Sequence, residues 1–305
     1  MKKFLLKCSF FIIIIIFVWG ANEAFYRFVP NNYTVKNKNI VNKYDDCEVL
    51  ILGNSHAFFG LNPRFFDMNT FNLSNVSQTL FFDKLLLEKH LKHFKKLKYV
   101  ILTVEYTTLS HSDNHPEMQW RKYFYEAQMG LHTGQINWFD IKKYSLALVP
   151  PTSINTTSIM TYFKQGTIAQ CESFGFAANI GVLSTYNNPT AAIDKMKQHE
   201  DGSLLFDRNL GRIKDIVKKC SQKGVKVILV NMPVTTYYAD NVNPEKRFKI
   251  VNSCNELALE NNLNYINLFQ DKAFDNKDFY DVDHLNIVGA KKCSQLINQY
   301  IHSFN

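Results

Sequence analysis

Short apolar runs alternate with amphipathic segments along much of the chain. The runs have the continuous hydrophobicity of strands that are covered on both faces of a parallel sheet. They predict strands over residues 48–52, 71–73, 99–104, 225–230 and 265–268. The segments between them repeat apolar residues at spacings of three and four, which is typical of helices that pack one side on a sheet. They predict helices over residues 82–97, 210–224, 244–260 and 286–300.

This alternation predicts an α/β fold. Parallel strands are joined by right-handed crossovers that place helices on both faces of the sheet, so we expect a three-layer α/β/α domain with five strands. Residues 105–203 interrupt the rhythm, because they are rich in aromatic residues, Thr, Asn and His, with Pro150 and Pro151 in their middle. They are predicted to form an insertion over the carboxyl edge of the sheet, helical in part around Met118 to Met129.

The first residues have the pattern of an export or anchoring segment. Lysines precede an uninterrupted apolar run from Phe10 to Trp19, and the apolar stretch as a whole is about 18 residues long, near the lower limit for spanning a bilayer. Residues 1–24 are therefore predicted as a signal anchor or a cleavable signal peptide, 25–46 as a linker and 47–305 as the folded domain. The lysines favour an inside N-terminus, which would place the domain in the periplasm or outside the cell, and secrete it if the signal is cleaved.

Charge and cysteine content exclude some classes of function. The formal net charge is +8, but the lysines are spread along the chain and an exported protein rarely meets nucleic acid. We expect no nucleic-acid partner and interpret the basic surface as facing anionic envelope polymer or lipid. The six cysteines are widely separated and have neither CxxC nor metal-ligand spacing, so no disulfide pairing, metal or cofactor is predicted from them.

Candidate chemistry begins where the first strand ends, at Gly53-Asn54-Ser55-His56. In an open parallel sheet the ligand crevice lies outside the carboxyl ends of the strands. Ser55 would stand there at the start of a helix, where free backbone N–H groups can stabilise an oxyanion. Such serines are also common as helix caps, so this motif alone does not establish a nucleophile. His56 is too close in sequence to act readily as the base of Ser55, although it can contact a substrate.

A second group of polar residues lies between the last strand and the last helix, in Asp281-Val282-Asp283-His284. This loop leaves the sheet at the same edge as Ser55. A neutral imidazole at His284 can take the serine proton, and a carboxylate three residues earlier can hold the other ring nitrogen. Asp281 has that spacing. For Asp283 a solvated turn residue and a functional one are both open, and Asn286 is predicted as a helix N-cap.

Together, the Gly53–His56 motif and the stretch from Asp281 to Ala290 resemble the first and last blocks of the SGNH/GDSL hydrolase superfamily. They are especially similar to its membrane-anchored branch, which includes alginate O-acetylation and D-alanyl-teichoic acid transfer proteins. The resemblance implies a flavodoxin-like sheet, with Ser55 as nucleophile and Asp281 and His284 acting from a single loop. It covers the two ends of the domain well and the middle poorly.

The chain also departs from that family. Its members offer a glycine after the second strand and an asparagine after the third as oxyanion donors. Here the second strand is followed by Ser74 and Asn75, whose backbone N–H groups could replace the glycine, and the third is followed by Glu105. Losing one such donor can cost about a hundredfold in rate or more. Besides the triad, the candidate oxyanion or substrate residues are Asn54, His56, Ser74 and Asn75.

The function expected from these features is that of an O-acyl esterase or O-acyltransferase acting on an envelope or secreted glycan through an acyl-Ser55 intermediate. Its expected partners are a glycan or other acylated or acyl-accepting substrate, the membrane and, by analogy with the family, an integral membrane acyltransferase. The alternative is a catalytically degenerate glycan-binding or assembly module of the cell envelope, which the missing asparagine motivates.

Overall fold

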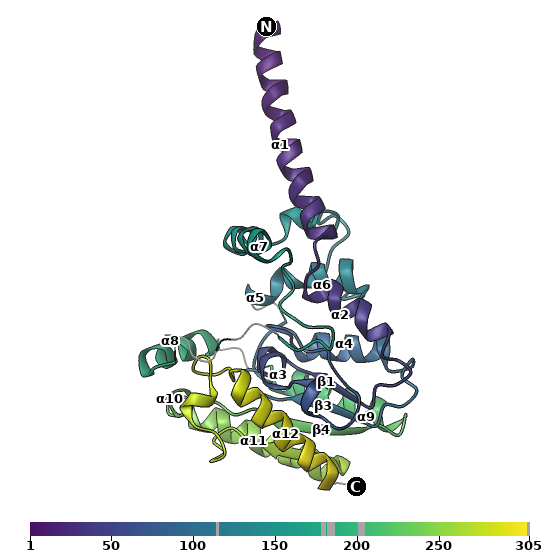
Figure 1. The fold of residues 1–305 in the computed structure, drawn as a ribbon, viewed down its shortest axis with the longest axis vertical. Coiled ribbons are helices and arrows are strands. Elements are labelled where there is room, and N and C mark those ends of the chain that lie inside the picture. Colours follow the sequence, from purple (N-terminus) through teal and green to yellow (C-terminus); the bar gives the residue numbers. More distant parts are fainter. Residues whose placement is uncertain (114–115, 178–180, 182–186, 201–204, 304–305) are drawn as a thin grey trace. The chain divides into compact units, whose positions relative to one another are not determined.

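The computed structural model describes residues 1–113, 116–177, 181, 187–200 and 205–303 (Figure 1). Internal contacts divide the chain into two compact units. The larger, called here the sheet unit, comprises residues 36–115 and 170–305. The smaller, called here the N-terminal unit, comprises residues 1–35 and 116–169.

Five parallel strands form the centre of the sheet unit. They are β1 (Val49–Leu52), β2 (Thr70–Asn72), β3 (Tyr99–Thr103), β4 (Lys226–Asn231) and β5 (Asn264–Asn267). They lie in the order β2-β1-β3-β4-β5, and each neighbouring pair is parallel. This is the strand order of flavodoxin-like folds. The predicted α/β fold with a five-stranded parallel sheet is confirmed, and each strand begins and ends within one residue of its predicted bounds.

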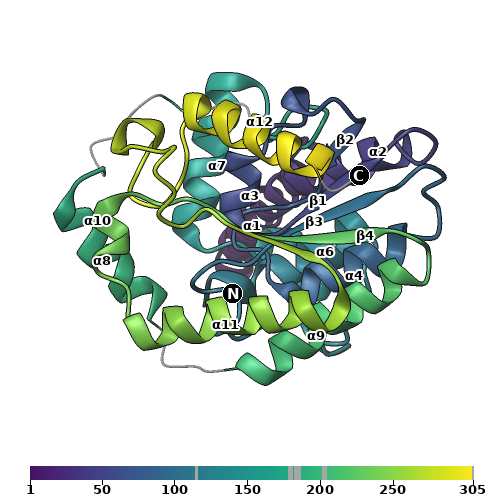
Figure 2. The ribbon, with the colours of Figure 1, turned by 90° about the horizontal axis from the view of Figure 1, so that it is seen from below.

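Helices cover both faces of this sheet, as Figure 2 shows. On one face α3 (Ser55–Gly60) packs against α12 (Ile287–Ser303). On the other face α4 (Leu80–His90) packs against α9 (Phe206–Ser221), which also contacts α11 (Pro244–Asn261). Shorter elements complete the unit: η1 (Pro63–Phe65), α8 (Pro189–His199), α10 (Thr236–Ala239) and η4 (Asn276–Asp278).

The core between the sheet and α12 is built from alternate strand residues, because side chains two positions apart on a strand share a face. Val49 and Ile51 of β1 meet Ile297 and Ile301 of α12 in one fully buried cluster. Complete burial of one such side chain is worth about 1.5–3 kcal/mol. This packing holds α12 against the sheet, and Leu285 of the same cluster anchors the loop that carries Asp281 and His284.

The order of the strands also decides where a ligand crevice can form. The chain passes from β1 to β2 on one side and then returns to place β3 on the other side of β1. The winding direction therefore reverses at β1, and the crevice of such a sheet lies at the carboxyl end of the strands beside the reversal. Ser55 follows β1 after the short turn of Gly53 and Asn54, so the topology alone brings it to this crevice.

The N-terminal unit consists of α1 and a set of shorter helices from the middle of the sequence. Its helices are α1 (Lys2–Phe28), α5 (Pro116–Gln119), α6 (Arg121–Met129), η2 (Ile141–Lys143), η3 (Leu146–Leu148) and α7 (Thr152–Gln165). The N-terminal helix is long and apolar enough to cross a membrane, judged by its length and composition. A signal sequence has the same properties.

The stretch 25–46, expected to be an irregular linker, is helical over most of its length. Helix α1 continues to Phe28, and α2 covers Asn32–Val41. The Asn- and Lys-rich composition hides a buried side that recurs at spacings of three and four, formed by Tyr33, Lys36 and Ile40. The linker prediction missed this helix because the middle residue of that side is a lysine.

The interval 105–203, predicted as one insertion, is divided between the two units. Only residues 116–169 group with α1, whereas α8 belongs to the sheet unit. The expected helix around residues 118–129 is present as α5 and α6. The last positions of the predicted insertion, residues 201–203, lie outside the described residues.

Candidate active site

Ser55 is the first residue of α3 and is held there by the turn that leaves β1. Gly53 adopts φ +135°, and a Cβ at this position would overlap the side chain of Thr103, so the turn requires glycine. The Gly53 N–H donates to Asp83 Oδ1 at 2.9 Å, which ties the turn to α4. Asn54 is the N-cap of α3, and its Oδ1 accepts the His56 N–H at 3.0 Å. The predicted substrate residue Asn54 thus has a local role in shaping the turn.

The loop before α12 is closed on itself by backbone hydrogen bonds. Phe279 and Leu285 form an antiparallel bridge, and the Tyr280 N–H donates to the His284 carbonyl at 2.8 Å. Asn286 Oδ1 accepts the N–H groups of Val288 and Gly289, both at 2.9 Å, which confirms its prediction as the N-cap of α12. The loop therefore presents His284 from a short, braced hairpin rather than from an open connection.

The two segments meet across 229 positions of sequence. His284 Nε2 lies 2.8 Å from Ser55 Oγ, and His284 Nδ1 lies 3.0 Å from Asp281 Oδ2. Asp281 Oδ1 accepts the backbone N–H of His284 at 2.8 Å and that of Asp283 at 3.1 Å, which fixes the orientation of the carboxylate. A carboxylate at Nδ1 favours the proton on that nitrogen and leaves Nε2 free to accept the serine proton. The structure thus brings Ser55, His284 and Asp281 together as a triad in which the imidazole contacts both the hydroxyl and the carboxylate.

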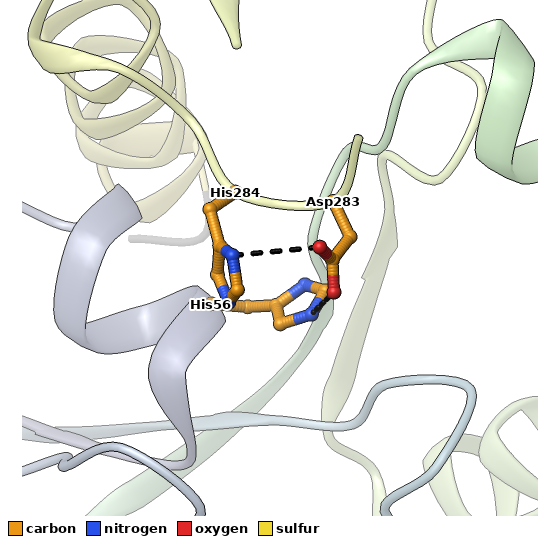
Figure 3. Close-up of side chains that lie close together, drawn as sticks. All are labelled: His56, Asp283 and His284. Atoms are coloured by element: carbon orange, nitrogen blue, oxygen red, sulfur yellow. Dashed lines mark ion pairs between the residues drawn. The ribbon is translucent and has the colours of Figure 1, made fainter. Parts of the chain in front are cut away.

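Asp283 is a second carboxylate at the same imidazole, and it is buried, with an exposed fraction of 1%. Its carboxylate lies beside two rings, as Figure 3 shows: one oxygen is 3.4 Å from His284 Nδ1 and the other is 3.4 Å from His56 Nε2. Burial opposes ionisation of this carboxyl, but the nearby His284 and Lys195 hold its pKa well below the usual range. Asp283 is therefore not the solvated turn residue that the sequence left open.

His56 lies between two buried acids. Its Nε2 faces Asp283, and its Nδ1 lies 3.6 Å from Glu105 Oε2. Burial alone would lower the pKa of His56, but the charges of Glu105 and Asp283 outweigh burial and raise it. For Glu105 burial dominates and raises the pKa to about 7. The two acids thus favour the protonated form of His56. His56 was not expected to be the base of Ser55, and the base position next to Ser55 Oγ is occupied by His284.

Three residues of this surrounding network were not predicted from the sequence. Lys195 Nζ and His199 Nε2, both on α8, lie 3.8 Å and 3.9 Å from the Asp283 carboxylate. Burial lowers the pKa of His199 to about 3, so that side chain is neutral, and its Nδ1 is hydrogen-bonded to Tyr238. Of the three residues, only Glu105 could have been predicted from the sequence to lie near the site, because it follows β3 at the carboxyl edge of the sheet. Nothing in the pattern of α8 connected it to the site.

The backbone groups predicted as oxyanion donors are engaged within the protein. The Ser74 N–H donates to Asn72 Oδ1 at 3.1 Å, and the Asn75 N–H donates to the Gly53 carbonyl at 3.2 Å. Lys36 Nζ donates to the carbonyl oxygens of Asn72 and Ser74, which holds this loop in place. Ser74 and Asn75 therefore shape the loop beside Ser55: the Ser74 N–H is bonded within this loop, and the Asn75 N–H is bonded to the turn after β1.

A metal ion would have to compete with the triad for its ligands. In the described part of the chain, His56, Asp283 and His284 offer ligand atoms that lie within 4.8 Å of one another. However, Nδ1 of His284 faces Asp281 and its Nε2 faces Ser55, so both ring nitrogens have partners. An ion bound to His284 would displace one of those partners and disable the imidazole as a base.

No family model matches this sequence, and no curated protein does. Similar solved structures include a GDSL-like lipase of Bacteroides thetaiotaomicron, with 13% identity and a TM-score of 0.45 over 90% of this chain and 100% of that one. A suspected acylhydrolase of Bacteroides fragilis has 14% identity and a TM-score of 0.45 over 89% of this chain and 95% of that one. At this level of similarity the likeness concerns the fold, and the function has to be argued from the site.

Proposed function

We propose that this protein is a serine-dependent O-acyl esterase or O-acyltransferase. The observation that carries the proposal is the pair of contacts made by His284, with Ser55 Oγ at 2.8 Å and Asp281 Oδ2 at 3.0 Å. An imidazole that contacts a hydroxyl on one side and a carboxylate on the other can activate the hydroxyl as a nucleophile. Buried charges around His284 keep the imidazole in one orientation.

The first half of the reaction transfers the acyl group to the enzyme. Ser55 Oγ attacks the ester carbonyl carbon while its proton moves to His284 Nε2, and Asp281 stabilises the imidazolium that forms. When the tetrahedral intermediate collapses, the bond to the alkoxy oxygen breaks and His284 returns the proton to that oxygen. The products are a free alcohol and an ester at Ser55.

The second half releases the acyl group by the same path. An acceptor hydroxyl gives its proton to His284 Nε2 and attacks the acyl-Ser55 carbonyl, after which the proton returns to Ser55 Oγ. Water as acceptor yields a carboxylic acid, and a sugar hydroxyl yields a new ester. The triad serves both outcomes, so the acceptor decides between an esterase and a transferase.

We infer further that the substrate is a glycan of the cell envelope or a secreted glycan. The apolar helix α1 supports this, because it is long enough to anchor the chain or to act as its export signal. The resemblance of the motifs at Ser55 and His284 to envelope O-acylation proteins points the same way. The formal charge of +8 suits a surface that works beside anionic envelope polymers.

The nucleophile is tested by covalent labelling of the full-length protein in detergent with a fluorophosphonate probe. We expect one label per chain in the wild type and none in Ser55→Ala. The matched control is Ser221→Ala, which removes an exposed serine at the end of α9 and should label like the wild type. Labelling of Ser55→Ala at the wild-type level would refute the proposed nucleophile.

The acceptor is tested with 4-nitrophenyl acetate in the presence and absence of an oligosaccharide. An esterase releases acetate and 4-nitrophenol in equal amounts under both conditions. A transferase releases less acetate than 4-nitrophenol when the oligosaccharide is present, and the missing acetyl groups are found on the sugar by mass spectrometry. Equal release of both products, with no acetylated sugar, would leave only the esterase.

A catalytically degenerate glycan-binding module is the second candidate function. It is favoured by Glu105, which stands where an oxyanion-binding asparagine is expected and instead accepts the Met232 N–H and faces His56. This candidate predicts no labelling and no ester turnover, whereas a catalytic triad predicts both. If the site is degenerate, the wild type and Ser55→Ala bind glycan equally well. Neither protein is then labelled by the probe, and neither turns over the ester.

A further inference from the structure

Helix α7 of the N-terminal unit is covered by very little of the protein. None of its fourteen residues is buried. Its apolar side chains include Phe163, which is 82% exposed, and Met160, which is 55% exposed. Exposed apolar residues that cluster on one element mark a surface that is covered by something else. The surroundings of α7 indicate what covers it.

Helices α1 and α7 line the same apolar groove, which has a volume of about 660 Å³. On the α1 side it reaches from Ile14 to Phe25, and on the α7 side it includes Ile159 and Phe163. Two contacts fix this arrangement: the rings of Phe25 and Tyr162 lie 5.5 Å apart, and Tyr26 donates to Asn155 at 3.0 Å. The side of α7 that faces the groove therefore lies along the apolar run of α1.

The segment between α6 and α7 adds a second exposed apolar group next to α1. Four of its large apolar side chains are more than half exposed: Trp138, Phe139, Ile141 and Tyr144. The segment is attached to the last turns of α1, because Trp19 Nε1 donates to Ser145 Oγ at 3.1 Å and Arg27 donates to the Tyr144 carbonyl at 3.0 Å. Aromatic residues of this kind are enriched where a protein meets the boundary between lipid and water.

The depth of α7 follows from the length of α1. The apolar run of α1 ends near Ala21, so a bilayer crossed by α1 has its surface close to that residue. Ile14 lies seven residues earlier, which is about 10 Å along a helix. The groove that α7 shares with α1 runs from Phe25, which lies beyond Ala21, to Ile14, so the side of α7 that lines it lies between the surface and at most about 10 Å below it. Amphipathic helices that lie in the interface bury their apolar side to a similar depth.

We propose that α7 and the 138–148 segment are seated in the lipid surface of the leaflet from which α1 emerges. The occupant of the exposed apolar surface is then phospholipid. The charges suit it, since residues 138–165 contain one acid, Asp140, and three bases, Lys142, Lys143 and Lys164. This inference is independent of the chemistry at Ser55, and it depends on α1 crossing the membrane.

The test measures the depth of single fluorophores in the full-length protein reconstituted into vesicles of phosphatidylcholine and phosphatidylglycerol. The partly exposed thiols Cys8 and Cys171 are first replaced by serine. A polarity-sensitive dye is then attached in separate variants at Phe163→Cys, at Gln165→Cys and at Phe11→Cys. Residues 163 and 165 are about 200° apart around α7, so Gln165 is the matched control on the opposite side of the same helix.

We expect lipids with a doxyl group on the acyl chain to quench most of the fluorescence at positions 11 and 163. Quenching at position 165 should be less than half of that, and emission at 163 should be shifted to shorter wavelength. Quenching at 11 with none at 163 would place α7 in water or against a protein partner and overturn the proposal. Absence of quenching at 11, or equal quenching at 163 and 165, would overturn it as well.

Discussion

Replacing Asp281 by asparagine exchanges a single oxygen for an amide nitrogen, and the surrounding hydrogen bonds decide where that nitrogen goes. Asp281 Oδ1 accepts two backbone N–H groups, those of Asp283 and His284, so the amide oxygen of an asparagine has to stay there. The amide nitrogen then takes the position of Oδ2 and points at His284 Nδ1. The oxygen at the Oδ1 position also lies 3.1 Å from Nδ1, but it already accepts two backbone N–H groups. We therefore expect the amide nitrogen to donate to Nδ1, which moves the imidazole proton to Nε2, where it blocks the transfer from Ser55.

The size of the effect can be worked out from the distance between the charges. A carboxylate 3.0 Å from an imidazolium nitrogen interacts by about 5.5 kcal/mol at an effective dielectric constant near 20. This attraction exists only when His284 is charged, so it lowers the barrier, and its loss corresponds to about ten-thousandfold in rate. Asp281→Ala lets water restore part of the screening and imposes no tautomer. We therefore expect it to be at least roughly tenfold more active than Asp281→Asn.

Asp283→Asn is the matched control, because it neutralises the other carboxylate beside the same nitrogen. At 3.4 Å its attraction to an imidazolium is about 4.9 kcal/mol. A protonated His56 ring, with its centroid 5.1 Å from that of His284, opposes it by about 3.3 kcal/mol. Asp283→Asn also removes a carboxylate that favours the protonated form of His56, so we expect His56 to lose its charge in this variant and the attraction and the repulsion to disappear together. The net loss is then about 1.6 kcal/mol, which corresponds to roughly tenfold.

The assay for this series is the kcat/KM of each variant for an aryl acetate, with thermal unfolding as a check that the fold is intact. Two results would refute the reasoning. One is Asp281→Asn with activity equal to or above that of Asp281→Ala, which would exclude the tautomer argument. The other is Asp283→Asn with a loss as large as that of Asp281→Asn, which would make Asp283 the orienting carboxylate.

Two further predictions concern stability and can be measured by thermal unfolding in detergent. Gly289→Ala should destabilise the protein and reduce ester turnover, since a Cβ there overlaps the Asp278 carbonyl; the control Gly211→Ala, with open space around it, should stabilise by about 0.5–1 kcal/mol. A stable, active Gly289→Ala would contradict the packing. Burial raises the pKa of Asp83 to about 7, so its contribution to stability is complete below pH 4 and is lost as the pH rises through 7. Between pH 4 and 8 the free energy of unfolding should therefore fall by up to about 4 kcal/mol less in Asp83→Asn than in the wild type. An unchanged pH dependence in the variant would show that Asp83 does not cause the fall.

The strands and the composition of the triad were accessible from the sequence because both depend on local pattern. Buried parallel strands are short apolar runs, and β1 and β3 begin where such runs begin. Once parallel strands are recognised, topology sends Ser55 and His284 to the same edge, and the spacing of Asp281 from His284 allows a closed loop. Each of these steps uses residues that are close together in the chain.

The surroundings of the triad were decided only by tertiary structure. Whether Asp283 faces solvent or the interior depends on α8, which is far away in sequence and supplies Lys195 and His199. The charge of His56 depends on two acids that the fold places on either side of it, Glu105 and Asp283. None of the residues of helix α7 is buried, and the pattern of the helix itself does not say what covers it. Local pattern records what a segment can form, whereas burial and charge in the site depend on which distant segments the fold brings together, because both are properties of the whole environment.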